Sequence, residues 1–97
     1  MLRQLFVIIE SRKTSMPEGS YTASLLSAGE GAILKKIEEE TMEVVMAARN
    51  EGEQRLVEEI ADLFYHTLVL LAARGLHLTA VEDELHHRHR GSNQDSL

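Results

Sequence analysis

The feature that most constrains this chain is a pair of acidic motifs placed symmetrically about one turn signal. Residues 39–43 read EETME, an EExxE pattern, and residues 59–62 read EIAD, an ExxD pattern. Between them, residues 50–52 read NEG. Asn and Gly tolerate the left-handed backbone conformation that ends a helix, so this triplet predicts a tight turn. The chain is therefore expected to fold around an antiparallel helical hairpin.

In such a hairpin, residues at equal distances from residue 51 face each other. Glu40 then faces Asp62 and Glu43 faces Glu59, and the two pairs lie about 4.5 Å apart along the helices. Two ionised carboxylates about 4 Å apart repel by on the order of 4 kcal/mol at an effective dielectric of 20. The cluster is expected either to hold protons or to bind a hard cation, because oxygen ligands favour Mg²⁺, Mn²⁺ or Ca²⁺ over Zn²⁺. A solvated acidic helix face explains EExxE alone but not the facing acids.

Composition favours a small all-α bundle. The 97 residues are 43% hydrophobic, which excludes disorder over most of the length, and they include only four aromatic residues and one proline. These values indicate aliphatic helices rather than a β-sandwich. We expect one domain over residues 1–90, followed by a flexible polar tail over residues 91–97. A chain this short buries a modest fraction of its surface, so the bundle is expected to be completed by dimerisation.

Charge and cysteine content exclude several classes of function. A net charge of -6 argues against a nucleic-acid partner, because binding to a duplex relies on a basic surface. The chain has no cysteine, which excludes disulfides and thiolate chemistry. No run of 18 or more apolar residues is present, so no membrane association is expected. A cytoplasmic protein is the default expectation.

Apolar residues at helical spacing predict four long helices. Their expected ranges are Leu2–Lys13, Ile33–Arg49, Gln54–Arg74 and Ala80–Arg90. Thr22 is expected to cap a short helical stretch over residues 23–28, and Thr79 is expected to cap the last helix. The third long helix should be central and most buried, because its second half is apolar all round. Its main apolar face is expected to comprise Leu56, Ile60, Leu63, Phe64, Thr67, Leu68 and Leu71.

Several other side chains are candidates for contact with a phosphorylated substrate. They are Arg12, Lys13, Lys35 and Lys36, which are basic, the hydroxyl-bearing Ser20, Tyr21 and Thr22, and His66. Helix capping and ordinary solvation explain the basic and hydroxyl groups about as well. His66 points toward the acids, so a core role, a role in supporting the acids and a substrate contact all remain open. His86, His87 and His89 suggest a metal cluster, but an exposed helix end is the simpler interpretation.

The motifs and their surroundings resemble a known family. EExxE followed after 15 residues by ExxD is similar to the signature of the MazG-like all-α nucleoside triphosphate pyrophosphatases. Within that superfamily, the chain resembles the phosphoribosyl-ATP pyrophosphatases of histidine biosynthesis from about Leu2 to Arg90. The segments that carry this resemblance are PEGSYT at 17–22, GE at 29–30, LKK at 34–36, EE at 39–40, EV at 43–44 and EIADLFYH at 59–66.

The resemblance implies hydrolysis of phosphoribosyl-ATP to phosphoribosyl-AMP and pyrophosphate, with a Mg²⁺ requirement and a helical homodimer. It implies that Glu40, Glu43, Glu59 and Asp62 are metal ligands and that Glu39 assists as a ligand or base. In this mechanism, water attacks the α-phosphorus while the basic side chains neutralise phosphate charge. One departure is Glu38, where a small residue is expected; it adds charge but replaces no ligand.

Two other functions are consistent with the same residues. A housecleaning pyrophosphatase acting on damaged or ordinary nucleoside triphosphates would use the same acids without a pocket for a second phosphoribosyl group. A non-enzymatic helical dimer that binds a divalent ion belongs to a different class. Activity against a panel of substrates, with and without Mg²⁺, distinguishes all three. The number of metal ions and the identity of the base are not specified by the sequence.

Overall fold

The computed structural model contains five helices and no strand in the part of the chain that it describes, residues 1–91. Most of the predicted tail, residues 92–97, lies outside the described residues. The helices are α1 (Leu2–Thr14), α2 (Tyr21–Ala28), α3 (Glu30–Asn50), α4 (Gly52–Ala73) and α5 (Leu78–Gly91). The all-α prediction is therefore confirmed, and the four long helices fall close to their predicted ranges.

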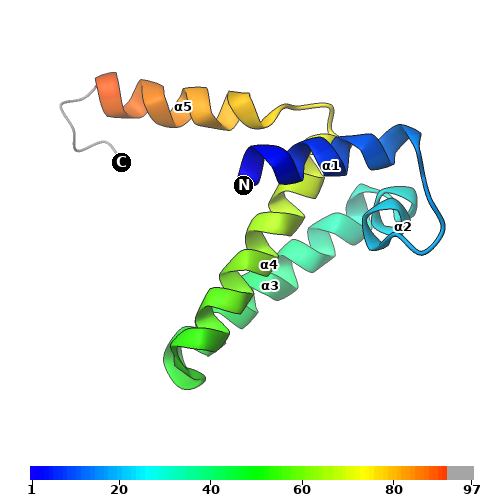
Figure 1. The fold of residues 1–97 in the computed structure, drawn as a ribbon. Helices are drawn as coiled ribbons and strands as arrows, with labels where there is room; N and C mark the ends of the chain where they lie inside the picture. Colours follow the sequence, from blue (N-terminus) through cyan, green and yellow to red (C-terminus); the bar gives the residue numbers. More distant parts are fainter. Residues whose placement is uncertain (92–97) are drawn as a thin grey trace.

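The fold is built on the antiparallel hairpin of α3 and α4, which lie side by side along most of their length (Figure 1). The chain reverses at Glu51, whose backbone amide donates to the Ala47 carbonyl at 3.0 Å. Gly52 follows with a φ of 86°, a left-handed conformation that favours glycine. The predicted turn is thus where the sequence signal placed it, and it sets the register in which the acidic motifs face each other.

The end of α4 is fixed by a glycine motif. The Gly75 amide donates to the Ala72 carbonyl at 3.1 Å, and the Leu76 amide donates to the Leu71 carbonyl at 2.9 Å. This pair of bonds is the Schellman arrangement, and Gly75 adopts the positive φ of 72° that it requires. The predicted helix end at Gly75 is confirmed.

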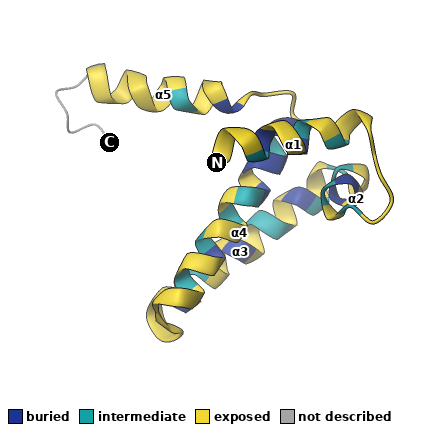
Figure 2. Ribbon diagram, in the orientation of Figure 1, coloured by how far each residue is buried: buried dark blue, intermediate teal, exposed yellow. Residues whose placement is uncertain are grey.

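The hydrophobic core lies at the end of the hairpin remote from the turn. There, α1 crosses the C-terminal half of α4, and α2 packs beside α1 and α3 (Figure 2). The largest fully buried side chains are Phe6 and Ile9 of α1, Ile33 of α3 and Val69 of α4. The core therefore fixes the start of α3 against the end of α4, while the acidic motifs lie further along the hairpin toward its turn.

Two predicted helix caps are wrong. The side chain that caps α2 is Ser20, whose hydroxyl accepts a hydrogen bond from the Ala23 amide at 3.1 Å. Thr22 lies inside the helix, because α2 begins at Tyr21 and not at residue 23. Similarly, α5 begins at Leu78, so Thr79 is helical and its backbone amide donates to His77 Nδ1 at 3.2 Å. Neighbouring hydroxyl residues compete as caps, and the sequence alone does not choose between them.

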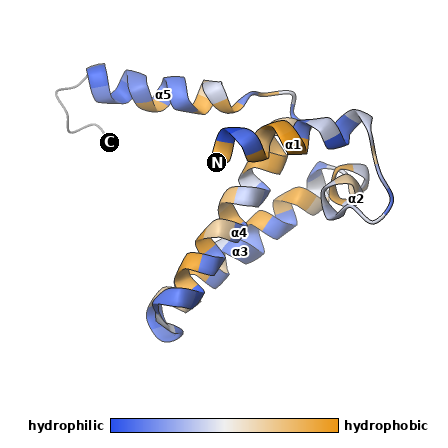
Figure 3. Ribbon diagram, viewed as in Figure 1, coloured by the Kyte–Doolittle hydropathy of each residue, from blue (hydrophilic) through white to orange (hydrophobic). Residues whose placement is uncertain are grey.

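The predicted apolar face of α4 is only partly covered. Phe64 is 51% exposed, and Thr67 is exposed as well. Figure 3 shows apolar residues along α4 and on part of α5, and α5 extends away from the hairpin. A groove of about 440 Å³ results between these elements. It is lined by Leu2, Leu63, Phe64, Thr67, Leu68, Leu71, Leu78, Val81, Glu82 and Leu85.

Candidate active site

Three of the four predicted acids meet between α3 and α4. One carboxylate oxygen from each of Glu40, Glu43 and Glu59 lies within 4.8 Å of the others. Glu40 and Glu59 are buried, whereas Glu43 is exposed. Asp62 is exposed and lines the same cavity, close enough to raise the pKa of both buried acids. Among the described residues, only Glu40, Glu43 and Glu59 bring together three side-chain groups able to hold a metal ion.

Glu59 shows most directly that the cluster is incomplete without a cation or a proton. Its side chain is 3% exposed, and its Oε1 atom has no hydrogen-bond donor. The pKa of Glu59 is raised, first by the close approach of the Glu43 carboxyl and then by burial. Two ionised carboxylates cannot donate to each other, so a hydrogen bond between Glu43 and Glu59 would require a proton on one of them. A divalent cation would satisfy the same oxygen without a proton, so the donor set fits a hard metal ion.

Glu40 is the second buried acid, at 4% exposure. Burial raises the pKa of Glu40, and the neighbouring Asp62 and Glu43 raise it further, while His66 and Lys36 act in the opposite direction. Lys36 remains cationic beside these acids. Burial alone would lower the pKa of Lys36, but Tyr21 and the surrounding carboxylates raise it overall.

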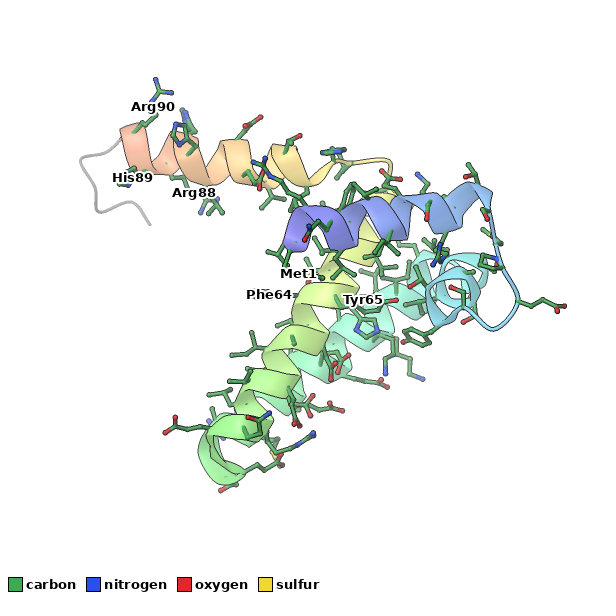
Figure 4. The ribbon with its side chains drawn as sticks, in the orientation of Figure 1. Met1, Phe64, Tyr65, Arg88, His89 and Arg90 are labelled. Atoms are coloured by element: carbon green, nitrogen blue, oxygen red, sulfur yellow. The ribbon has the colours of Figure 1, made fainter. Side chains whose placement is uncertain are left out.

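The acids open into a cavity of about 560 Å³. It is lined by Tyr21 from α2, by Lys36, Glu40 and Glu43 from α3, and by Arg55, Glu59, Asp62, Tyr65 and His66 from α4. The cavity thus has an acidic floor, one lysine and two aromatic hydroxyls, a combination suited to a metal-bound polyphosphate. Figure 4 labels Tyr65, which lies where α4 runs alongside α3.

Aromatic side chains connect α2 to the acidic side of the hairpin. The Tyr21 hydroxyl lies 2.8 Å from His66 Nε2, and the Thr22 hydroxyl bonds the Tyr65 hydroxyl. The rings of Tyr21 and Tyr65 stack with centroids 6.1 Å apart. These contacts hold the start of α2 at the rim of the cavity.

The predicted substrate-contacting residues divide into two groups. Lys36, Tyr21 and His66 line the cavity with the four acids. The remaining predicted residues are not among its lining: Glu39, Lys35, Ser20, Thr22, Arg12 and Lys13. Some of these have other partners. Lys13 pairs with Glu10 at 3.7 Å, and Arg12 Nη1 donates to the Ser11 hydroxyl at 3.1 Å.

Glu39 lies one residue from the buried Glu40 but points elsewhere. It is exposed, and its Oε1 atom lies 3.7 Å from Lys36 Nζ. It is therefore close to a cavity residue without lining the cavity itself, and its role as ligand or base stays a prediction.

Two cavity residues were not predicted as site residues. Arg55 pairs with Glu59, with Glu58 at 2.9 Å and with Glu51 at 3.7 Å. The spacing of Arg55 and Glu59, four residues apart on a helix, was the available signal for this pair. Tyr65 reaches the cavity because α2 brings Thr22 against it, a contact that no helical periodicity predicts.

The histidines of α5 do not form such a site. His86 and His87 line a surface hollow with Asp83 and Arg90, and all are exposed. Figure 4 labels His89 near Arg88 and Arg90 at the far end of α5. This agrees with the interpretation of an exposed helix end. Over residues 1–91, none of the helices combines the length and apolar content needed to cross a bilayer.

Comparison with known proteins identifies the family. The family model for phosphoribosyl-ATP pyrophosphohydrolase matches residues 2–89. A phosphoribosyl-ATP pyrophosphatase of Metallosphaera sedula is 52% identical over 88 residues, which cover 91% of this chain and 95% of that relative. The phosphoribosyl-ATP pyrophosphatase of Pelotomaculum thermopropionicum is 53% identical over 85 residues, which cover 88% of this chain and 84% of that relative. The phosphoribosyl-ATP pyrophosphatase of Bacillus cytotoxicus is 47% identical over 88 residues, which cover 91% of this chain and 82% of that relative. The chain belongs to the phosphoribosyl-ATP pyrophosphohydrolase family.

Proposed function

We propose that this protein hydrolyses phosphoribosyl-ATP to phosphoribosyl-AMP and pyrophosphate in a Mg²⁺-dependent reaction of histidine biosynthesis, where it is the second step. The observation that carries the proposal is the buried Glu59 Oε1 atom, which lacks a donor beside Glu40 and Glu43. Relatives that cover most of this chain are named for the same activity.

Glu40, Glu43, Glu59 and Asp62 would hold the metal, and Mn²⁺ would substitute for Mg²⁺ because both accept oxygen ligands. When bound, the ion neutralises phosphate charge and polarises the phosphorus under attack. Arg55 contributes from outside this set. Its pairs with Glu58 and Glu59 hold the Glu59 carboxylate in place and offset part of its charge.

The other cavity residues are assigned to the substrate and the attacking water. Lys36 neutralises phosphate charge, since its ammonium group lies at the cavity wall beside the acids. The exposed Tyr21 side chain offers an aromatic surface and a hydroxyl at the rim. Glu39, or another acid not engaged by metal, orients or deprotonates the water that attacks the α-phosphorus. Pyrophosphate then leaves.

Pyrophosphate release tests this proposal. We expect release from phosphoribosyl-ATP in Mg²⁺, loss of release in EDTA, and a strong preference over ATP, dCTP and dUTP. Asp62→Asn should lower kcat/KM by more than about 100-fold. This is a larger loss than the one usually seen when a residue that hydrogen-bonds a metal ligand is removed. Asp83→Asn on the exposed surface of α5 is the matched control and should change nothing. Equal turnover of ordinary nucleoside triphosphates would favour the housecleaning activity, and metal-independent binding without release would contradict an enzyme.

We also propose that the protein is a homodimer, with the groove between α4 and α5 as its interface. The radius of gyration is 15.2 Å, whereas a compact domain of this length has about 12–13 Å. Phe64 and Leu85 in this groove are 51% and 49% exposed. A second copy would cover this apolar surface, which a lone soluble chain rarely leaves open.

A further inference from the structure

His66 is a buried side chain that links the acidic cluster to α2. It is 5% exposed, and both of its ring nitrogens have partners. Nδ1 lies 2.7 Å from Glu40 Oε1 and 2.9 Å from the backbone carbonyl oxygen of Asp62. Nε2 lies 2.8 Å from the Tyr21 hydroxyl. The imidazole therefore touches two of the acids proposed as ligands, one through its side chain and one through its backbone.

These partners determine where the imidazole proton lies. A backbone carbonyl can only accept, so Nδ1 carries a proton and donates to Asp62. The Glu40 carboxylate lies beside the same nitrogen as an ion-pair contact. In the neutral ring Nε2 is then an acceptor, and the Tyr21 hydroxyl donates to it. The hydrogen bonds thus run from Tyr21 through His66 to the Asp62 backbone, and the Glu40 carboxylate lies 2.7 Å from the same Nδ1 atom.

We propose that His66 is a positioning residue that orients the Glu40 carboxylate for the divalent cation, and that Tyr21 holds His66 in the tautomer this requires. The inference rests on the proposed metal centre. A close polar contact from a neighbouring side chain fixes the direction of a ligating carboxylate, so losing that contact weakens metal binding even though no ligand is removed. It also gives α2 a role in metal binding, although no acid of the cluster comes from that helix.

A purely structural role for these contacts makes a different prediction. Two hydroxyl contacts join α2 to α4: Tyr21 to His66, and Thr22 to Tyr65. Only the first continues to a carboxylate of the cluster. If the contacts served only to hold α2 in place, removing the Tyr21 hydroxyl or the Thr22 hydroxyl would have the same effect on the metal site.

The test is Mn²⁺ affinity without substrate, followed by the electron paramagnetic resonance signal of free Mn²⁺. His66→Leu should bind Mn²⁺ about 10–100-fold more weakly than wild type. His66→Asn should recover most of the loss, because its amide N–H lies near the position of Nδ1–H. Tyr21→Phe should weaken binding about fivefold, the size of one neutral hydrogen bond. Thr22→Val removes the other hydroxyl contact at a residue outside the cavity lining, so it is the matched control and should leave the affinity unchanged.

A second measurement follows the tautomer directly and needs no metal. Long-range ¹H–¹⁵N NMR spectra of the wild-type protein should show the His66 proton on Nδ1. A proton on Nε2 would overturn the proposal. Wild-type Mn²⁺ affinity in His66→Leu would also overturn it, and so would equal effects of Tyr21→Phe and Thr22→Val. This last comparison decides if His66→Leu does not fold.

Failure of this inference is distinguishable from failure of the proposed function. Glu59→Gln removes an acid from the cluster and should abolish Mn²⁺ binding. If wild type binds Mn²⁺ no better than Glu59→Gln, both the metal centre and the role of His66 are overturned. If wild type binds tightly and His66→Leu binds equally well, only the positioning role is overturned.

Discussion

The side chains of Glu40 and Glu59 are almost completely buried on facing helices, although carboxylates are rarely buried without a partner. Glu40 has the imidazole of His66, and Glu59 has the guanidinium of Arg55. Neither partner compensates for all the charge, since the pKa of both acids remains raised. The metal-free protein therefore carries electrostatic strain at these two residues, which a divalent cation would relieve.

This strain predicts an unusual dependence of stability on pH. The ordinary glutamate pKa is 4.5, and the folded pKa of Glu40 is raised above it, first by burial. As pH rises above that ordinary value, unfolded Glu40 loses its proton before folded Glu40 does, so rising pH favours unfolding until the folded value is passed. Below the ordinary value both states are protonated and the penalty vanishes.

Glu40→Gln isolates this contribution, because glutamine does not ionise. In EDTA, the melting temperature of Glu40→Gln should exceed that of wild type at pH 8, and the difference should shrink as pH falls toward 5. Thermal unfolding followed by circular dichroism measures both. Saturating Mn²⁺ should reverse the order at pH 8, because only wild type gains binding free energy. A difference independent of pH would show that the Glu40 charge is fully compensated.

Glu39 and Glu38 form a natural pair for testing the base. Both are exposed on α3, but only Glu39 lies near Lys36, at 3.7 Å. If Glu39 acts on the attacking water, Glu39→Gln should lower kcat by about 10²-fold or more, the contribution of a general base, with Mn²⁺ affinity kept. Glu38→Gln should leave kcat unchanged. Loss of Mn²⁺ affinity in Glu39→Gln would instead indicate that Glu39 is a metal ligand. Equal kcat in Glu39→Gln and Glu38→Gln would exclude Glu39 both as a base and as a ligand.

At the scale of the helices, the sequence was most informative where a local signal and a long-range pattern agreed. Asn50-Glu51-Gly52 marked the turn, and three of the four acids placed symmetrically about it, Glu40, Glu43 and Glu59, lie together. The sequence was less informative where neighbouring residues could serve the same purpose. Ser20 rather than Thr22 caps α2, and this choice depends on where the chain leaves the preceding loop.

The cavity itself was only partly predictable for the same reason. Helical spacing places Lys36 near the acids, but it says nothing about which side chains of α2 reach them. Tyr21 and Tyr65 come together through tertiary packing of α2 on the hairpin. The spacing of Arg55 and Glu59 indicated that they pair, but it is equally typical of an ordinary surface ion pair, which contributes little to stability on its own.

The turn that sets the register can be tested with two glycine substitutions of opposite effect. Gly52 has a φ of 86°, and nothing lies within 4 Å of a Cβ added there. Gly52→Ala should therefore destabilise through backbone strain alone, by about 1–2 kcal/mol, lowering the melting temperature by about 4–8 °C per kcal/mol. Gly31 is helical and equally open, so Gly31→Ala should stabilise by about 0.5 kcal/mol. Destabilisation by both would point to packing rather than strain.

At the scale of the whole molecule, residues 1–91 leave part of the apolar surface of α4 and α5 exposed. The sequence predicted the apolar face of α4 correctly as a pattern but could not say what covers it. Part of that face packs on α1 through Leu68, while Phe64 faces outward (Figure 4). Helical periodicity is identical whether the partner is another helix of the same chain or a second copy, so the partner is set by geometry that the pattern does not contain.

The exposed groove leads to a prediction about molecular mass. Light scattering after size exclusion should give wild type twice the 10.9 kDa of one chain. Phe64→Glu places a charge where the proposed interface would exclude water, so this variant should have the mass of a single chain, whether or not it keeps its helical content. Met16→Glu, at an apolar residue that is 49% exposed but outside the groove, should remain a dimer. A Phe64→Glu dimer as stable to dilution as wild type would show that α4 and α5 do not form the interface.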